Sequence, residues 1–194
     1  MSILVLTSDT LIGTPATGNI EYSGQFYGTD SNASRAQIQR ITQGTAVAST
    51  SGTSITFSSL PTWIKRITVM FNGVSTSGTS IPLVQLGAGS VTSTGYLGAS
   101  SNIQSATTSF NYTTGIGIAN GGSAAAVIHG AIVFTSLGSN AWVAAGVLGK
   151  SEAAITISSA GSVTLGGTLD RVVITTVNGT DTFDAGSINI LYEG

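Results

Sequence analysis

Charge is what this sequence has least of. Only 7% of its 194 residues are Asp, Glu, Lys or Arg, where about 25% is typical of soluble domains. With six basic residues and a formal net charge of -2, the chain lacks the basic surface that binds a phosphate backbone, so we expect no nucleic-acid partner. A surface so poor in charge is weakly protected against self-association. We therefore expect much of it to be covered in a homo-oligomer or a larger assembly.

Cysteine is absent and histidine occurs once. No disulfide can form, so cysteine usage does not indicate whether the protein resides in an oxidising or a reducing compartment. The common zinc sites, which need several Cys or His ligands, are excluded. The start, "MSILVLTSDT", has no basic stretch ahead of its apolar run, which argues against a signal peptide. The apolar run "AAAVIHGAIVF" is too short to span a bilayer. We expect no cofactor and no membrane insertion.

The first 42 residues differ in pattern from the rest. The stretch "GTPATGNIEYSGQFYGTDSNASR" is rich in turn-forming residues and shows little alternation. Its two aromatic pieces, "IEY" and "QFYGT", predict a small hairpin around residues 23–24. Because so short a segment cannot bury a core alone, we expect residues 1–42 to form an extended N-terminal arm that attaches to a partner or a sister chain.

From residue 43 onward, short runs rich in Val, Ile, Thr and aromatic residues alternate with Gly, Ser and Asn clusters. Period-two alternation is clearest at Ile67, Val69 and Phe71, which places one stripe of side chains on a core face. No convincing helical period occurs. The pattern predicts strands within residues 45–50, 54–60, 65–74, 81–88, 95–100, 110–118, 125–137, 141–149, 154–167, 170–177 and 187–193. We predict an all-β fold: an antiparallel β-sandwich or jelly-roll-like domain over residues 43–194.

Two aspartates, Asp181 and Asp184, stand close together near the end of the sequence. In an extended strand, positions three apart point to opposite faces, so the pair cannot line one cleft. Asn178 and the glycine after it predict a hairpin turn just upstream, and Arg171 is placed to pair with one aspartate across that hairpin. We therefore expect a turn with a structural ion pair. A calcium loop remains the alternative, although the stretch offers few oxygen ligands.

The single histidine, His129, lies inside an apolar run. That setting favours a core or interface histidine over a member of a Ser-His-Asp triad. The sequence contains neither a Gly-x-Ser-x-Gly elbow nor a phosphate-binding loop. We expect no catalytic residue and no enzymatic activity.

Aromatic residues beside turns are candidates for stacking on sugar rings. Trp142 follows a turn, and Tyr96 and Tyr112 lie beside glycine-rich stretches. An exposed ring among hydroxyl and amide groups suits a carbohydrate, but core packing is the commoner fate of such side chains. Trp63, just ahead of the clearest strand, is expected to plug an end of the sandwich.

Three segments resemble a known family of proteins. "LPTWIKRITVMFNGVSTSGTSIPLVQLG" and "LDRVVITTVNGTDTFDAGSINILYEG" resemble a module of bacteriophage and prophage tail fibres or related virion structural proteins. "GTPATGNIEYSGQFYGTDSNASR" resembles the connector that precedes the C-terminal domains of such fibres.

This resemblance implies a β-rich, trimeric virion component, located in the phage tail or another external appendage. It would bind other virion proteins through its N-terminal arm and could present a face to a bacterial surface polysaccharide. A short tail fibre, fibre tip or adaptor is the leading expectation. A head-attached fibre or capsid decoration protein is the alternative, and a glycan depolymerase is less favoured because the sequence offers few acids for a catalytic groove.

Overall fold

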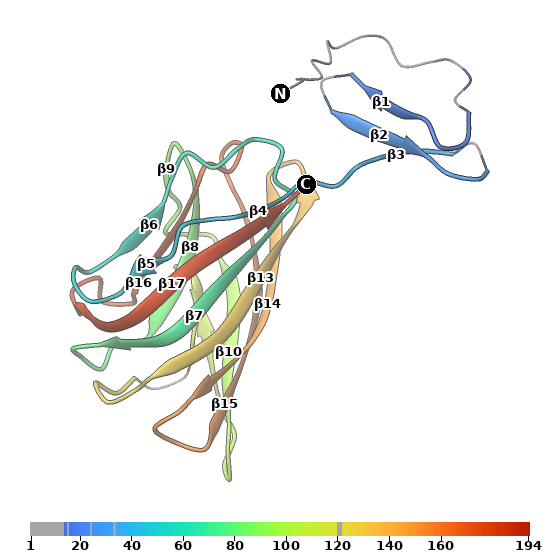
Figure 1. Ribbon diagram of the computed structural model, residues 1–194. Helices are drawn as coiled ribbons and strands as arrows, with labels where there is room; N and C mark the ends of the chain where they lie inside the picture. The colour runs from blue at the N-terminus through green and yellow to red at the C-terminus, as the bar shows by residue number, and fades with distance from the viewer. Residues whose placement is uncertain (1–13, 15, 24, 33, 120–121) are drawn as a thin grey trace, which may run out of the picture. The chain divides into compact units, whose positions relative to one another are not determined.

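The computed structural model describes residues 14, 16–23, 25–32, 34–119 and 122–194. The chain divides into two compact units, residues 1–40 and 41–194. Every strand pair in the described residues is antiparallel, and these residues contain no helix (Figure 1). The all-β antiparallel fold predicted from the sequence is confirmed.

The smaller unit is a folded three-stranded sheet rather than an extended arm. It consists of β1 (Ile20–Tyr22), β2 (Phe26–Thr29) and β3 (Arg35–Gln37), joined in sequence order. The predicted hairpin is present, since Tyr22 pairs with Phe26 across it. The expected boundary at residue 42 lies two residues too late, because β4 begins at Ile41 and pairs with the C-terminal strand of the larger unit.

The three-stranded sheet has one apolar and one polar face. Cross-strand pairing aligns Tyr22 with Phe26, and the amide of Ile38 donates to the Phe26 carbonyl oxygen at 2.8 Å. On the opposite face, the Arg35 guanidinium forms an ion pair with Glu21 at 2.7 Å. Because the sheet alternates with period two, the apolar side chains of this unit gather on one side. Three of them are 45–71% exposed: Ile20, Phe26 and Ile38.

The larger unit is a sandwich of two unequal sheets (Figure 1). The nine-stranded sheet has the order β11-β10-β15-β14-β13-β7-β17-β4, with β5 also paired to β17. The five-stranded sheet has the order β12-β8-β16-β6, with β9 also paired to β8. This order does not confirm a jelly roll.

The strand bounds of the nine-stranded sheet are β4 (Ile41–Gln43), β5 (Val47–Ala48), β7 (Arg66–Thr76), β10 (Leu97–Ile103), β11 (Thr108–Tyr112), β13 (Ile128–Gly138), β14 (Ala141–Lys150), β15 (Ile155–Thr164) and β17 (Phe183–Glu193). Those of the five-stranded sheet are β6 (Ile55–Phe57), β8 (Pro82–Ala88), β9 (Ser90–Val91), β12 (Ile116–Gly117) and β16 (Arg171–Thr176).

The core lies between the two sheets. Ile67, Val69 and Phe71 of β7 are at most 4% exposed, as their alternation predicted. They share one hydrophobic cluster with Val172 and Ile174 of the opposite sheet, both fully buried. Burying each such aliphatic side chain contributes about 1.5–3 kcal/mol to the stability of the folded state.

The predicted hairpin at Asn178 is wrong. Gly179 does form a turn there, with φ at 69° and its amide bonded to the Thr176 carbonyl oxygen at 3.0 Å. The strands on either side, β16 and β17, however, belong to different sheets. The six-residue connection is a crossover between layers, and the local Asn-Gly signal does not distinguish a crossover from a hairpin.

Three neighbouring strands of the nine-stranded sheet each contain a glycine with positive φ, and these glycines lie at neighbouring positions across the strands. These are Gly186 in β17, Gly73 in β7 and Gly130 in β13, with φ of 90°, 68° and 127°. The pairing registers of β13 with β7 and of β7 with β17 both shift there. Such bulges bend a sheet and increase its twist, so this glycine row curves the large sheet.

Replacing Gly186 with alanine should destabilise the fold. Its added Cβ would lie 2.3 Å from the Gly73 carbonyl oxygen, and its φ of 90° disfavours any L side chain. We expect Gly186→Ala to lower the free energy of unfolding by at least about 2 kcal/mol, measured by urea denaturation. Gly149→Ala in β14 is the matched control, since its nearest neighbour would be 3.9 Å away. Equal stability of the two variants would contradict a constrained bulge.

Candidate functional site

The three aromatic candidates for stacking on sugars are buried, as is commoner for such side chains. Tyr96 is 1% exposed, and Tyr112 and Trp142 are 4% exposed. Each therefore lacks the ring face open to solvent that stacking needs, and the structure excludes all three as stacking residues. A neighbouring turn signals a chain reversal, but it does not say whether the adjacent side chain points inward or outward.

Tyr96 completes the backbone hydrogen bonding of β8, an inner strand of the five-stranded sheet. Its hydroxyl accepts a hydrogen bond from the Leu86 amide at 2.7 Å. Leu86 lies in β8 between the stretch paired with β12 and the stretch paired with β9. Burial raises the pKa of Tyr96 to about 12, against the smaller lowering effect of its hydrogen bond with Leu86. Tyr96 thus has a structural role: its ring packs in the core, and its hydroxyl accepts a hydrogen bond from a buried amide.

Tyr112 is anchored in the same manner at the edge of the other sheet. Its hydroxyl donates to the Ala119 carbonyl oxygen, and burial raises its pKa above the usual value. Ser100 also donates to the Ala119 carbonyl oxygen, at 2.6 Å. These bonds hold the segment after β12 against the inner face of β10 and β11.

The expected ion pair between Arg171 and a C-terminal aspartate does not form. Arg171 instead pairs with its neighbour Asp170 at 2.8 Å; it lies on the five-stranded sheet, while Asp184 lies on the nine-stranded one. The guanidinium lowers the pKa of Asp170, and the carboxylate raises that of Arg171. The hairpin that was expected to bring Arg171 and the aspartates together is absent.

The two aspartates have separate structural roles. Asp181 accepts hydrogen bonds from the Asn178 side-chain amide at 2.7 Å and from the Ser80 backbone amide at 2.8 Å. These bonds lower its pKa. Asp184 accepts a hydrogen bond from the Ser75 hydroxyl. Asp181 thus participates in the predicted turn, and the two carboxylates bond to different partners.

His129 is exposed in the single chain, so of the two expected settings, core or interface, the core is wrong. Its Nδ1 accepts the Gly73 amide at 3.2 Å, across the glycine row of the large sheet. Trp63 is half-buried and packs on Tyr192, with ring centroids 5.7 Å apart. Among the described residues, no three His, Cys, Asp or Glu side chains cluster as metal ligands. In the same part of the chain, no helix is long and apolar enough to cross a membrane.

The most extensive surface feature is the outward face of the nine-stranded sheet. Strand registers align its side chains in rows that run across β17, β7, β13, β14, β15 and β10. One central row consists of Leu191, Thr68, Val133, Ala145, Ala160 and Ala99. The next consists of Asn189, Met70, Ala131, Val147, Ser158 and Ser101. We call these rows, with Thr135, Val143, Ser162 and Leu97 beside them, the outer sheet face.

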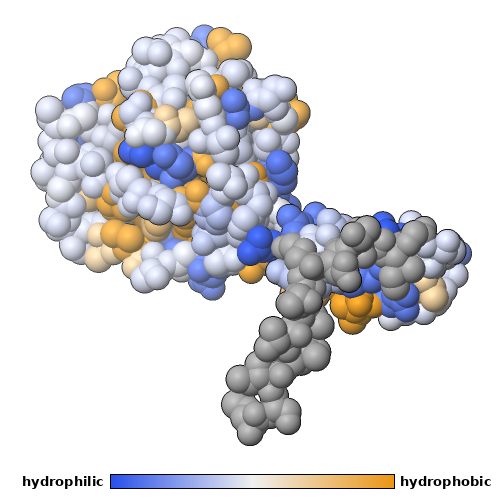
Figure 2. All heavy atoms as spheres, turned by 90° about the horizontal axis from the view of Figure 1, so that it is seen from above, coloured by the Kyte–Doolittle hydropathy of each residue, from blue (hydrophilic) through white to orange (hydrophobic). Residues whose placement is uncertain are grey.

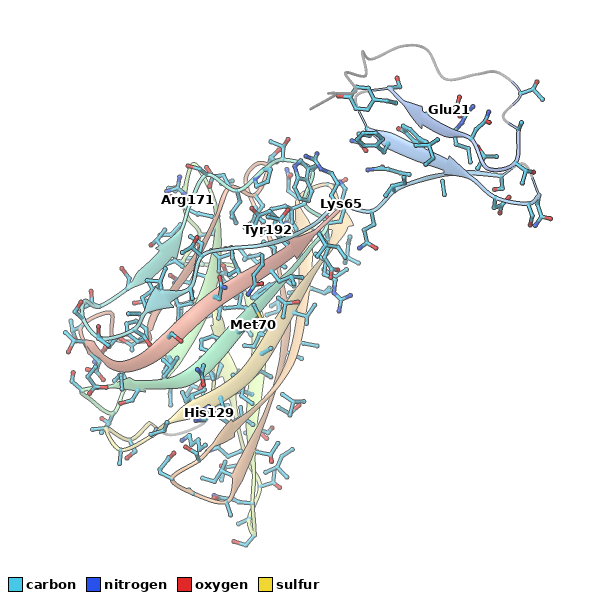
Figure 3. All side chains as sticks on the ribbon, viewed as in Figure 1. Glu21, Lys65, Met70, His129, Arg171 and Tyr192 are labelled. Carbon is cyan, nitrogen blue, oxygen red and sulfur yellow. The ribbon has the colours of Figure 1, made fainter. Side chains whose placement is uncertain are left out.

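No side chain of the outer sheet face is charged. An ion pair between Arg66 and Glu193, at 3.5 Å, marks one border, and Met70 and His129 lie along β7 and β13 (Figure 3). Val147 is 63% exposed and Leu97 77%. Figure 2, which views the molecule from above and not onto this face, shows that the larger unit's surface is mostly pale, with scattered blue and orange residues. The outer sheet face offers no acid-base or metal chemistry, but it can be buried against another flat, neutral surface.

The signal for this face was present in the sequence. In β14 and β15 the residues between the buried positions are Ala, Ser, Thr, Val and Gly, and in β7, β10 and β17 most of them are uncharged. Only the strand order brings them into one continuous area, however. From strand and residue spacings that area is roughly 500 Å², somewhat below the roughly 800 Å² that one partner contributes to a standard protein interface.

Removing the Tyr96 hydroxyl should weaken the fold without changing its shape. Tyr96→Phe leaves the Leu86 amide buried without its acceptor, which costs about 1–3 kcal/mol. We expect that loss in the free energy of unfolding, measured by urea denaturation at neutral pH. Tyr192→Phe removes a hydroxyl from a half-buried ring and should change stability by less than about 0.5 kcal/mol. A Tyr96→Phe protein as stable as the unmodified chain would refute this role.

Comparison with known proteins identifies no relative of this chain. No family model matches it, and neither a curated protein nor a solved structure matches significantly.

Proposed function

We propose that this protein is a structural subunit of a bacteriophage virion, a short tail fibre, fibre tip or adaptor, that assembles as a homotrimer. Two lines of argument support this function. Three segments, which together hold 77 of the 194 residues, resemble phage fibre modules, and the larger unit carries a broad uncharged sheet face. The protein would reside in the virion as part of the tail or another external appendage, with a non-enzymatic role.

The outer sheet face is the observation that carries the proposal. A monomer would leave Val147, Leu97 and a row of alanines in water on a surface with no charge to oppose association. A second copy is the occupant we infer, since the face offers no charge that would select a different partner. Each copy also supplies the same flat, neutral surface. The trimeric state follows from the resemblance.

The N-terminal unit supports a role in attachment. Three short strands with one apolar face are the smallest sheet that is stable by itself in water, and Ile20, Phe26 and Ile38 still expose 45–71% of their surface. Contact with another virion protein would bury this apolar face and stabilise the small sheet. We therefore assign residues 1–40 to anchoring and residues 41–194 to the outward-facing body.

Two alternatives remain within or near this class. A head-attached fibre or capsid decoration protein would use the same neutral sheet face, and only its place on the particle would differ. A glycan depolymerase is disfavoured, because Asp181 and Asp184 bond to different partners and share no groove. A position on the particle can be established by imaging virions labelled on this chain.

A charge at the centre of the outer sheet face should separate the subunits. Native mass spectrometry of the unmodified protein should give three times the 19.4-kDa chain mass. Ala160→Glu would bury a carboxylate without a partner, at a cost of several kcal/mol, so we expect it to shift the mass to that of one chain. Because Ala160 is exposed in the single chain, its strand content by circular dichroism should be unchanged.

Ala106→Glu is the matched control, since Ala106 is exposed in the loop between β10 and β11. This variant should keep the oligomeric mass. A monomeric unmodified protein would contradict the proposed assembly. An Ala160→Glu protein that remains fully oligomeric would show that the subunits contact each other through another surface.

A further inference from the structure

A cleft opens at the free edge of the nine-stranded sheet, on the side away from the outer sheet face. Its volume is about 420 Å³, within the range of small-molecule sites. One wall is β11 and the residues after it, and the other wall includes the loop from β7 to β8 and Val177 of the crossover between the sheets. The cleft thus lies at the edge of the sandwich, where the two sheets separate.

Phe110 is the exposed aromatic residue of this cleft. It pairs with Ser100, which is buried, so Phe110 points to the inner side of its sheet. Yet its side chain is 58% exposed, because β11 is the edge strand. The neighbouring Tyr112 ring packs on it with centroids 5.4 Å apart, and the Tyr112 hydroxyl is fixed to Ala119. The Phe110 ring is therefore supported from one side and open on another.

The opposite wall is held by hydrogen bonds. The Ser80 amide donates to Asp181 at 2.8 Å, and the Ser80 hydroxyl accepts the Asn178 amide at 2.9 Å. Asp181 also binds the Asn178 side chain. These bonds tie the loop from β7 to β8 to the crossover loop. Val177, 52% exposed, adds an apolar surface to this wall.

The chemistry of the lining defines the class of ligand. Besides Phe110 and Val177, the cleft is lined by hydroxyl-bearing residues, including Thr79 and Ser80, and by no ionisable group other than the anchored phenol of Tyr112. A phosphate or other strong ion would find no countercharge. A molecule with an apolar ring face and several neutral hydroxyl groups matches both parts of the lining.

We propose that this cleft binds an uncharged saccharide, with one sugar ring stacked on Phe110 and its hydroxyl groups bonded to the polar wall. The inference deepens the proposed function by naming a ligand class for the outward-facing body. It replaces Trp142, Tyr96 and Tyr112, whose rings are buried, with an aromatic residue that solvent can reach.

Titration with neutral oligosaccharides tests the cleft directly. The unmodified protein is titrated calorimetrically with gluco-, galacto-, manno- and N-acetylhexosamine oligosaccharides, and with sialylated forms of the same chains. We expect binding to at least one neutral series and weaker binding to its sialylated form. Phe110→Leu keeps an apolar side chain but removes the aromatic face, and should weaken that binding at least tenfold. Phe110→Trp should retain it.

Leu97→Ala is the control, because Leu97 is 77% exposed but belongs to the outer sheet face. It should leave saccharide affinity unchanged. The inference is overturned if no neutral saccharide binds at millimolar concentration, or if Phe110→Leu binds as well as the unmodified protein. Native mass is recorded for each variant. Loss of the oligomer in Phe110→Leu would assign the cleft to subunit contacts instead, whereas absent binding with an intact trimer leaves the proposed function standing.

Discussion

The structure depends on one constraint: the central rows of the nine-stranded sheet are uncharged on both faces, but only the inner face is covered. Alternation along each strand sends Ile67, Val69 and Phe71 into the core, and the residues between them outward. In most antiparallel sheets the outward set is charged and solvated. Here it is alanine, serine, threonine and valine, which is why so little charge remains in the sequence. The inward face is stabilised by the second sheet, and the outward face is left to an intermolecular contact.

Glycines shape this sheet as much as apolar side chains stabilise it. The row formed by Gly186, Gly73 and Gly130 allows backbone conformations that other residues disfavour. Where the ladder shifts, side chains complete the pairing: His129 accepts the Gly73 amide in the large sheet, and Tyr96 accepts the Leu86 amide in the small one. His129 and Tyr96, which the sequence suggested as candidates for catalysis or ligand binding, therefore serve as hydrogen-bond acceptors for backbone amides. Buried backbone amides need such partners.

The sequence predicted the strands well because alternation is a local property. Each run proposed from residue 45 onward overlaps an observed strand, although residues 110–118 divide between β11 and β12 of different sheets. Long-range arrangement was predicted less well. The Asn-Gly turn was taken for a hairpin and connects two layers, so Arg171 lies apart from Asp184. Trp142 was a candidate for exposure because a turn precedes it, although core packing was the commoner expectation, and strand direction places it inside. Phe110 was overlooked because only the strand order identifies β11 as an edge.

Assembly and ligand binding need not compete in this molecule, because they use opposite sides of one strand pair. In β10, Leu97 and Ala99 point outward into the outer sheet face, while Ser100 points inward. In β11, Phe110 lies opposite Ser100 and so shares the inner side. A copy packed against the outward side would leave the Phe110 ring accessible from the sandwich edge. The alternation that hides the core thus also separates the surface that would join subunits from the surface that would meet a saccharide.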